Sequence, residues 1–261
     1  MTIGASSVND SVREQFGAAA NAYATSAVHA SGPDLAAMVR LAELTGTEDV
    51  LDMGSGAGHC ALTFGPHVAR VRGIDVTPEM VAVANRLAGE RALANVSFEQ
   101  GDVERLPFPD ATFDRVTSRL SAHHYADPQR ALSEALRVLR PGGMFLLVDS
   151  AAPEDAALDT FFQAVEFLRD PSHVRNWRGS EWVRMVASAG FAGAAVRERF
   201  APFIDGAGWV QRIHTPPPRV AMLRELFAQA TPAQRAAFDL REEPWGLCIP
   251  FVLLTAKRPR D

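Results

Sequence analysis

The sequence predicts an α/β fold, in which a doubly wound and mostly parallel β-sheet is flanked by helices. Short apolar segments typical of buried strands alternate with segments of helical spacing between about residues 33 and 150, which is the pattern of parallel strands joined by helical crossovers. A glycine-rich turn follows the first predicted strand, and acidic residues end several strands. Ligands of such sheets bind at the carboxyl ends of the strands, so these residues are the first candidates for a site.

The composition limits the kinds of protein that this chain can be. It has 261 residues, of which 47% are hydrophobic, enough for a single α/β domain over residues 1–261 with a cap. Its 26 basic and 31 acidic residues provide no basic field, so we expect no nucleic-acid partner. Cys60 and Cys248 form no C-x-x-C motif, which argues against a disulfide framework or a cysteine-rich zinc site.

No leader pattern or long apolar run occurs. We predict a cytoplasmic protein without a membrane span, and the sequence allows a homodimer.

Three stretches precede the glycine-rich turn. Residues 1–11 are small and polar, and we expect them to be mobile. Residues 12–30 are predicted to be helical and contain the aromatic residues Phe16 and Tyr23. Residues 33–44 are predicted to form a helix whose apolar side covers the sheet.

The glycine-rich turn indicates which nucleotide the sheet binds. Gly54, Gly56 and Gly58 have the spacing G-x-G-x-G, and His59 stands where a dinucleotide fingerprint would need its third glycine. Asp52, two residues before the turn, would repel a pyrophosphate but would suit a ligand with an ammonium group. S-adenosylmethionine (SAM) has an ammonium, a sulfonium and no phosphate, so it satisfies both details. The alternative is an ordinary glycine turn of an α/β protein.

The chain then alternates between helix and strand up to residue 150. Asp75 ends the second predicted strand and follows Gly54 by 21 residues; an acidic residue at about this distance bonds the ribose hydroxyls in doubly wound folds. Thr77 and Pro78 indicate a helix start, as N-cap and first-turn residue. The other elements predicted here are helices at 58–66 and from Asp127-Pro128, and strands at 71–76, 96–98, 113–118 and 144–149.

Beyond residue 150 the pattern is less regular. Residues 151–190 have a mostly helical pattern and carry several Phe and Trp residues, and strands are predicted at 192–204 and 247–256. The segment between these two strands is much longer than a hairpin needs. We therefore predict a helical cap over the substrate side, built from residues 151–190 and 205–245.

Four motifs carry a resemblance to a known family. They are LDMGSGAG, GIDVTPEM, GDVERLPFPDATFD and LRVLRPGGMFLLVD. Together they resemble the class I SAM-dependent methyltransferases, and they are most similar to the small-molecule branch that includes the ubiquinone and menaquinone methyltransferases. The resemblance is strong over residues 47–150. It implies a Rossmann-like, seven-stranded sheet whose last strand is antiparallel, with N-terminal helices (residues 1–45) over the cofactor.

The same resemblance implies a set of cofactor-binding residues for SAM. Asp52 and the glycine turn would hold the methionyl end, Asp75 the ribose, and Asp102 with Val103 the adenine, while Tyr23 would close the pocket or simply pack a terminal helix. The complete predicted set is Tyr23, Asp52, Gly54, Ser55, Gly56, Gly58, Asp75, Val76, Met80, Gly101, Asp102, Val103 and Ser118.

Two adjacent histidines are the candidate catalytic residues. Methyl transfer from SAM mainly requires positioning, and a base helps when the nucleophile is a hydroxyl or an activated carbon. His123 and His124 follow the fourth predicted strand, and histidine titrates near neutral pH. We slightly prefer His124 as the base; the alternative is that one histidine is structural and the other exposed. No metal is predicted, because adjacent histidines lack an obvious third ligand.

The methyl acceptor is the least defined part of the prediction. Candidate acceptor contacts are Arg119 after the fourth predicted strand, and His173, Trp177, Trp182 and His214 in the predicted cap. The alternative for the four cap residues, and the commoner role of such residues, is simply to pack the cap. We predict transfer of a methyl group to a carbon or oxygen of a small-molecule metabolite, quinone-like or aromatic. The alternatives are a SAM-binding protein that does not methylate and an NAD(P)-dependent oxidoreductase on a similar sheet.

Overall fold

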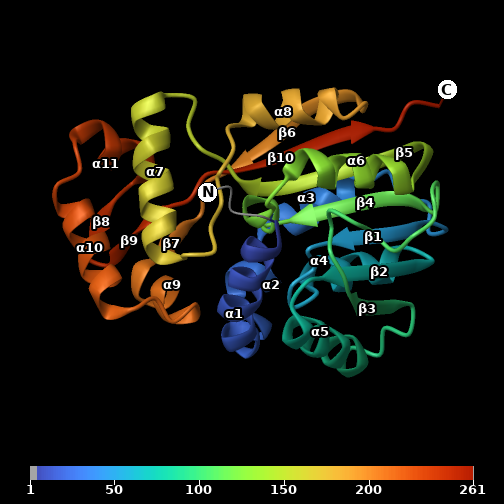
Figure 1. Cartoon of the computed structure of the whole chain (residues 1–261), viewed down its shortest axis with the longest axis horizontal. Coiled ribbons are helices and arrows are strands. Elements are labelled where there is room, and N and C mark those ends of the chain that lie inside the picture. Colours follow the sequence, from blue (N-terminus) through green and yellow to red (C-terminus); the bar gives the residue numbers. More distant parts are fainter. Residues whose placement is uncertain (1–4, 261) are drawn as a thin grey trace.

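The computed structural model describes residues 5–260 and contains the predicted seven-stranded sheet (Figure 1). Its strand order is β3-β2-β1-β4-β5-β10-β6, and β10 runs antiparallel to both of its neighbours. The strands are β1 (Asp49–Met53), β2 (Arg70–Asp75), β3 (Val96–Gln100), β4 (Phe113–Arg119), β5 (Leu139–Ser150), β6 (Ala192–Phe200) and β10 (Phe251–Lys257). The predicted fold class, with its antiparallel last strand, is confirmed.

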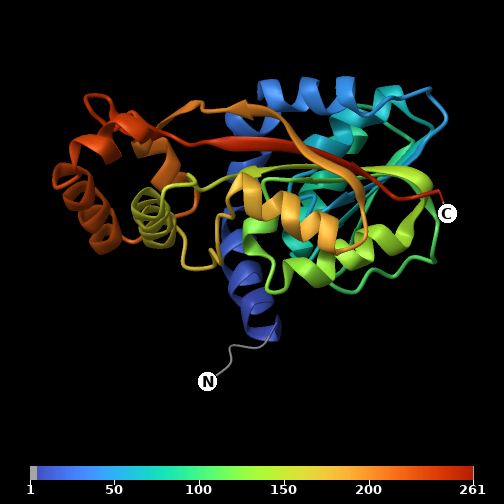
Figure 2. The same ribbon diagram turned by 90° about the horizontal axis from the view of Figure 1, so that it is seen from above.

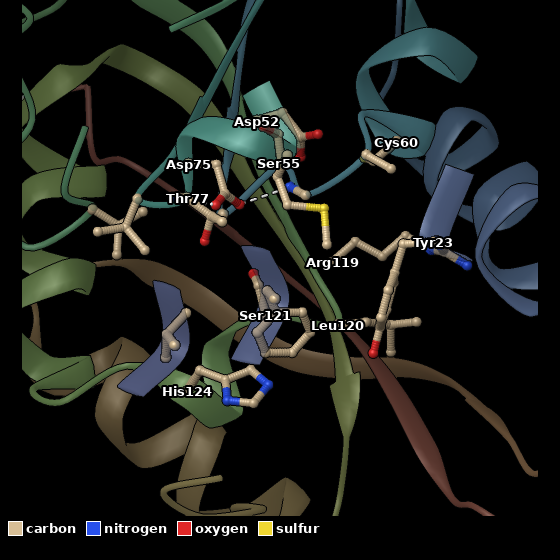
Figure 3. Close-up of a pocket in the computed structure, with 18 of the residues that line it drawn as sticks. Tyr23, Asp52, Ser55, Cys60, Asp75, Thr77, Arg119, Leu120, Ser121 and His124 are labelled. Atoms are coloured by element: carbon tan, nitrogen blue, oxygen red, sulfur yellow. Dashed lines mark hydrogen bonds between the residues drawn. The ribbon is translucent and has the colours of Figure 1, made fainter. Parts of the chain in front are cut away.

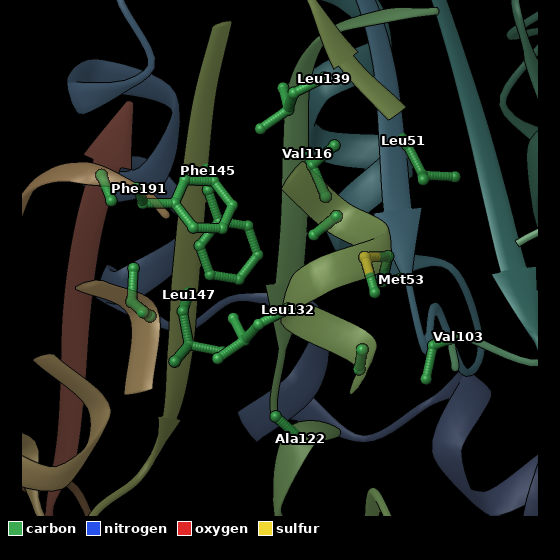
Figure 4. Close-up of a cluster of buried hydrophobic side chains, with 14 of the residues drawn as sticks. Leu51, Met53, Val103, Val116, Ala122, Leu132, Leu139, Phe145, Leu147 and Phe191 are labelled. Atoms are coloured by element: carbon green, nitrogen blue, oxygen red, sulfur yellow. The ribbon is translucent and has the colours of Figure 1, made fainter. Parts of the chain in front are cut away.

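Helices cover both faces of the sheet, because its central strands are apolar on both sides (Figure 2). Phe145 and Leu147 of β5 face α6 (Pro128–Val138) and α8 (Gly179–Ser188), in the cluster of Figure 4. Leu146 and Val148 face the other side, which is covered by α3 (Pro33–Leu41), α4 (His59–Phe64) and α5 (Pro78–Glu90). Strands buried on both faces are expected in a parallel sheet.

A smaller body lies beyond the carboxyl ends of the strands, at the left of Figure 1. It has its own apolar core around Phe162, Trp209, Phe238 and Leu247. Its helices are α7 (Ala156–Arg169), α9 (Gly206–Arg212), α10 (Pro217–Ala228) and α11 (Pro232–Phe238). Its strands are β7 (Phe203–Asp205), β8 (Arg241–Glu242) and β9 (Trp245–Cys248), which form a small sheet of order β7-β9-β8. The region expected to form the cap at 151–190 therefore divides: α7 lies in the cap, whereas α8 packs on the main sheet.

The N-terminal helix α1 (Ala5–Ala24) lies between the two bodies (Figure 1). Ala19 and Ala20 pack against Met80 and Val83 of α5. Residues 5–11, which we expected to be mobile, lie in the first turns of α1, and residues 1–4 lie outside the described residues. Within the described range, no helix has the length and hydrophobicity that a membrane crossing requires.

Two predicted strands are interrupted by proline. The strand expected at 192–204 divides into β6 and β7 around Pro202, and the strand expected at 247–256 divides into β9 and β10 at Pro250. Proline has no N–H to donate to a neighbouring strand. These two interruptions allow the chain to leave the main sheet, form the cap and return.

Candidate active site

A cavity, here named cavity A, opens at the carboxyl ends of β1–β4. The chain crosses over in opposite directions from β1 and β4, which lie side by side, and such switch points are where doubly wound sheets bind ligands. The cavity encloses about 910 Å³, including its open mouth. The predicted cofactor residues that line it are Tyr23, Asp52, Gly54, Ser55, Gly56, Asp75, Val76, Met80, Gly101, Asp102 and Val103.

The two remaining predicted cofactor residues, Gly58 and Ser118, lie behind the cavity wall. Gly58 has φ +87°, and a Cβ there would lie 2.6 Å from the Phe98 ring, so it lets α4 begin close to β3. Ser118 Oγ lies 3.0 Å from the hydroxyl of Tyr125, which does line the cavity. Both residues shape the wall rather than face the cavity.

Asp75 organises the glycine turn. One carboxylate oxygen accepts a hydrogen bond from Gly56 N at 2.7 Å, the dashed line in Figure 3, and the other accepts one from Thr77 N at 2.9 Å. Burial raises the pKa of Asp75, although these two hydrogen bonds act in the opposite direction and lower it. Each oxygen keeps a lone pair for a ligand. Ser55 Oγ and Thr77 Oγ1 are buried without a hydrogen-bond partner among residues 5–260, so this wall has unused polar groups.

Two further carboxylates reach the same cavity. Asp52 accepts hydrogen bonds from Thr117 Oγ1 at 2.8 Å and from Ala61 N, in the first turn of α4, at 3.2 Å. Burial raises its pKa to about 6. Asp102 accepts from Asn9 Nδ2 at 3.0 Å. The acidic residues that end or follow β1, β2 and β3 therefore converge on one cavity.

The N-terminal segment forms the wall opposite the sheet. The Nε2–H of His59 donates to the carbonyl of Tyr23 at 2.9 Å. Arg119 lines cavity A, but its guanidinium is engaged by the buried carboxylate of Asp34 and by the carbonyl of His29 at 2.8 Å. Arg119 thus holds the N-terminal segment that carries Tyr23. We had predicted that the charge of Arg119 would contact the methyl acceptor, but in the structure this charge is paired with Asp34.

A second cavity, cavity B, lies between the main sheet and the cap and encloses about 550 Å³. It shares five lining residues with cavity A, namely Phe16, Tyr23, His29, Leu120 and His124. The remaining residues that line it are Val28, His123, Ser150, Glu166, Arg169, Ile204, Trp209, Arg212, Ile249 and Phe251. A group bound in cavity A can therefore meet a second molecule in cavity B.

His123 lies on the wall of cavity B and is oriented by a buried carboxylate. Its Nδ1 donates to Asp149 Oδ1 at 2.6 Å, and its backbone N donates to Asp149 Oδ2 at 2.9 Å. Asp149 is fully buried. Burial lowers the pKa of His123, but Asp149 outweighs it, so that the pKa lies above the usual 6.5. With Nδ1 engaged, Nε2 is the nitrogen that can accept a proton.

His124 lines both cavities but has a different environment (Figure 3). Its Nδ1–H donates to the carbonyl of Ser172 at 3.1 Å, and its ring packs edge-on against Phe16. Burial, and then the charge of His123, lower its pKa to about 4. His124 is therefore neutral near pH 7. Its Nε2 lies 3.8 Å from Asp170 Oδ2, but unlike His123 it has no carboxylate bonded to Nδ1.

The other predicted acceptor residues line neither cavity. Trp182 is 1% exposed and packs in the core beside β5, and Trp177 packs against the same core. His214 is exposed after α9. His173 is buried behind the paired histidines and bonds Gln163. Within residues 5–260, no group of His, Cys, Asp and Glu side chains is arranged to hold a metal ion.

Several residues of the site were not predicted from the sequence. Asp149 lies near the carboxyl end of β5, the same signal that indicated Asp52 and Asp75, and it could have been found in that way. Glu166 and Arg169 in α7 carry no comparable signal. They lie one turn apart in an ordinary amphipathic helix, and only the tertiary fold turns them toward a cavity.

Known proteins share this chain's sequence and fold. Residues 51–147 match the family model described as a methyltransferase domain. The uncharacterized methyltransferase YcgJ of Bacillus subtilis is 40% identical over 92% of this chain and 96% of its own length, and a crystal structure of YcgJ superposes with a TM-score of 0.82 over 87% of this chain and 98% of that one, at 38% identity. The ubiquinone/menaquinone biosynthesis C-methyltransferase UbiE of Methylobacterium nodulans is 30% identical over 70% of this chain and 66% of its own length. This chain belongs to the class I SAM-dependent methyltransferases.

Proposed function

We propose that this enzyme transfers the methyl group of SAM to a carbon or oxygen of a quinone-like or aromatic metabolite, with His123 as the base. The observation that supports it most is the junction of the two cavities. Cavity A has the acceptors and donors that an adenosyl group needs, cavity B adjoins it at Tyr23, Leu120 and His124, and His123 lies on the wall of cavity B.

The residues of cavity A fit SAM. The free lone pairs of Asp75 suit a ribose diol, and Ser55 and Thr77 offer hydroxyls without partners among residues 5–260. Asp102 with Val103 would hold the adenine, and Asp52 with the glycine turn the methionyl end. A bound ammonium would favour the ionised form of Asp52, opposing the effect of burial. SAM supplies a methyl group on a sulfonium, which is a good leaving group.

His123 would take the proton that the acceptor loses. Bound SAM would supply the methyl group and leave as S-adenosylhomocysteine, and His123 Nε2 would receive the acceptor proton. Asp149 fixes the tautomer through Nδ1 and stabilises the imidazolium that results. A base near neutral pKa contributes about 10²–10⁴-fold to such a step.

The acceptor class rests on the apolar part of cavity B and on one relative. Ile204, Trp209 and Phe251 line this cavity and can pack against a ring. The M. nodulans relative is named as a C-methyltransferase of ubiquinone and menaquinone biosynthesis, which supports a carbon acceptor on a quinone-like molecule.

Transfer of a labelled methyl group tests this proposal. The enzyme is incubated with methyl-labelled SAM and a metabolite extract of the native host, and labelled products are identified by mass spectrometry and NMR. We expect a product labelled on carbon or oxygen with wild type and almost none with His123→Gln, although both bind S-adenosylhomocysteine. Wild-type protein that binds S-adenosylhomocysteine but labels nothing would be a SAM-binding protein without transferase activity.

A further inference from the structure

We propose that the methyl acceptor carries a single ionised carboxylate, which binds between the guanidinium groups of Arg169 and Arg212 in cavity B. This inference rests on the proposed function, because it takes cavity B as the acceptor site. The carboxylate is a binding group and not the methylated group, since an ionised carboxylate has no proton for His123 to remove.

Arg169 is a buried cation with spare hydrogen-bonding capacity. It is 7% exposed. Its Nη2 donates to the hydroxyl of Tyr23 at 3.3 Å and its Nε to the carbonyl of Trp209 at 3.4 Å, both long bonds to neutral groups. Within residues 5–260 no carboxylate lies within ion-pair distance of its guanidinium. Burial lowers the pKa of Arg169, but the nearby Tyr23, Asp170 and Glu166 outweigh this effect and raise it. Buried charges are costly unless paired, so Arg169 is suited to receive an anion.

Arg212 adds a second guanidinium to the same wall. It is the last residue of α9 and lines cavity B, and it forms no hydrogen bond or ion pair with another described side chain. Burial, and then the charge of Arg169, lower the pKa of Arg212. Both arginines line cavity B, so an anion bound between their guanidinium groups would be attracted by two cations. A guanidinium binds a carboxylate through two parallel hydrogen bonds.

Glu166 limits the charge of the anion. It lies one helical turn before Arg169, lines cavity B and is 6% exposed. It has no hydrogen-bond or ion-pair partner among the described residues, and burial raises its pKa. Among the residues that line cavity B, the groups that are charged or titrate near pH 7 are Glu166, Arg169, Arg212 and His123. With Glu166 ionised and His123 in the neutral form that acts as the base, the lining carries one net positive charge, which suits a monoanion. A phosphate dianion would be repelled by Glu166, whereas a hydroxyl or amino group on the acceptor could donate to it.

The other residues that line cavity B indicate that the rest of the acceptor molecule is apolar. Ile204, Trp209, Ile249 and Phe251 give cavity B an apolar side, and the Arg169 guanidinium lies 5.2 Å from the Trp209 ring centre. An apolar or aromatic body can pack there while its carboxylate reaches the arginines. The inferred substrate class is thus an apolar, preferably aromatic, monocarboxylic acid with a second, methylatable group.

Charge fractionation of the acceptor tests this inference. A metabolite extract of the native host is separated by anion exchange at pH 7 into unretained, low-salt and high-salt fractions, and each is assayed with labelled SAM. We expect methyl incorporation in the low-salt fraction, which contains monoanions. Incorporation only in the unretained fraction, or only in the high-salt fraction, would overturn the inference and leave the proposed function standing. No incorporation in any fraction would reject both.

Arginine variants test the same inference at the level of residues. Arg212→Gln is expected to raise the half-saturating amount of the active fraction about 10- to 100-fold, with the affinity for S-adenosylhomocysteine unchanged. Arg184→Gln, at an exposed position of α8, is the matched control and should behave as wild type. If Glu166→Gln weakens acceptor binding and Arg212→Gln does not, the acceptor is held by a cationic or donor group and the inference is wrong.

Discussion

Replacing Asp75 with alanine is expected to weaken the binding of S-adenosylhomocysteine by about 100-fold or more. A hydrogen bond to a charged group contributes about 1.5–3 kcal/mol, and two ribose hydroxyls can each bond one oxygen of Asp75. The substitution also removes the acceptors for Gly56 N and Thr77 N, so that the turn loses its support. Isothermal titration calorimetry measures the change directly.

Two variants make this result specific to the ribose contact. Asp75→Asn keeps the volume but exchanges one acceptor for a donor, and we expect an affinity between those of wild type and Asp75→Ala. Asp110→Ala removes an exposed carboxylate that pairs with Arg137 outside the cavity, and its affinity should match wild type. Equal affinities of wild type and Asp75→Ala would show that Asp75 does not hold the cofactor.

Replacing His123 with glutamine is expected to lower kcat by about 10²–10⁴-fold while leaving the affinity for S-adenosylhomocysteine within a factor of a few. The neutral imidazole is the active base, so kcat of the wild type should rise with pH through the pKa of His123. Because Asp149 holds that pKa above 6.5, the rise should be centred above 6.5. The pH profile of kcat under SAM saturation measures it.

Replacing Asp149, the hydrogen-bond partner of His123, tests the predicted direction of the pH dependence. Asp149→Asn removes the negative charge that raises the pKa of His123, so the rise of kcat should move to lower pH while its plateau falls. His214→Gln, at an exposed position outside both cavities, is the control. An unchanged pH profile in Asp149→Asn, or normal kcat in His123→Gln, would exclude His123 as the base.

The parts of the fold that could be predicted from the sequence are those with a local physical signature. Glycines with positive φ at 54, 56 and 58, apolar strands and acidic strand ends are properties of short segments, and a parallel sheet brings its strand ends together by its topology. This is why Asp52, Asp75 and Asp102, which are far apart in the sequence, could all be expected at one cavity.

The acceptor side could not be predicted in the same way. Trp182 and Trp209 are both aromatic residues of amphipathic helices, yet Trp182 packs under the main sheet and Trp209 lines cavity B. Their spacing is compatible with either position. Likewise, the sequence does not show that Asp149 lies beside His123, which is the contact that leads us to propose His123 rather than His124 as the base. Such distinctions depend on how the cap folds back onto the sheet.

The most direct test of the account is a crystal structure of the enzyme with S-adenosylhomocysteine. The account predicts adenine beside Asp102, ribose hydroxyls on Asp75, and the sulfur at the junction of the cavities near Tyr23, Leu120 and His124, facing cavity B. A nucleoside whose sulfur points away from cavity B, toward the open mouth of cavity A, would contradict it.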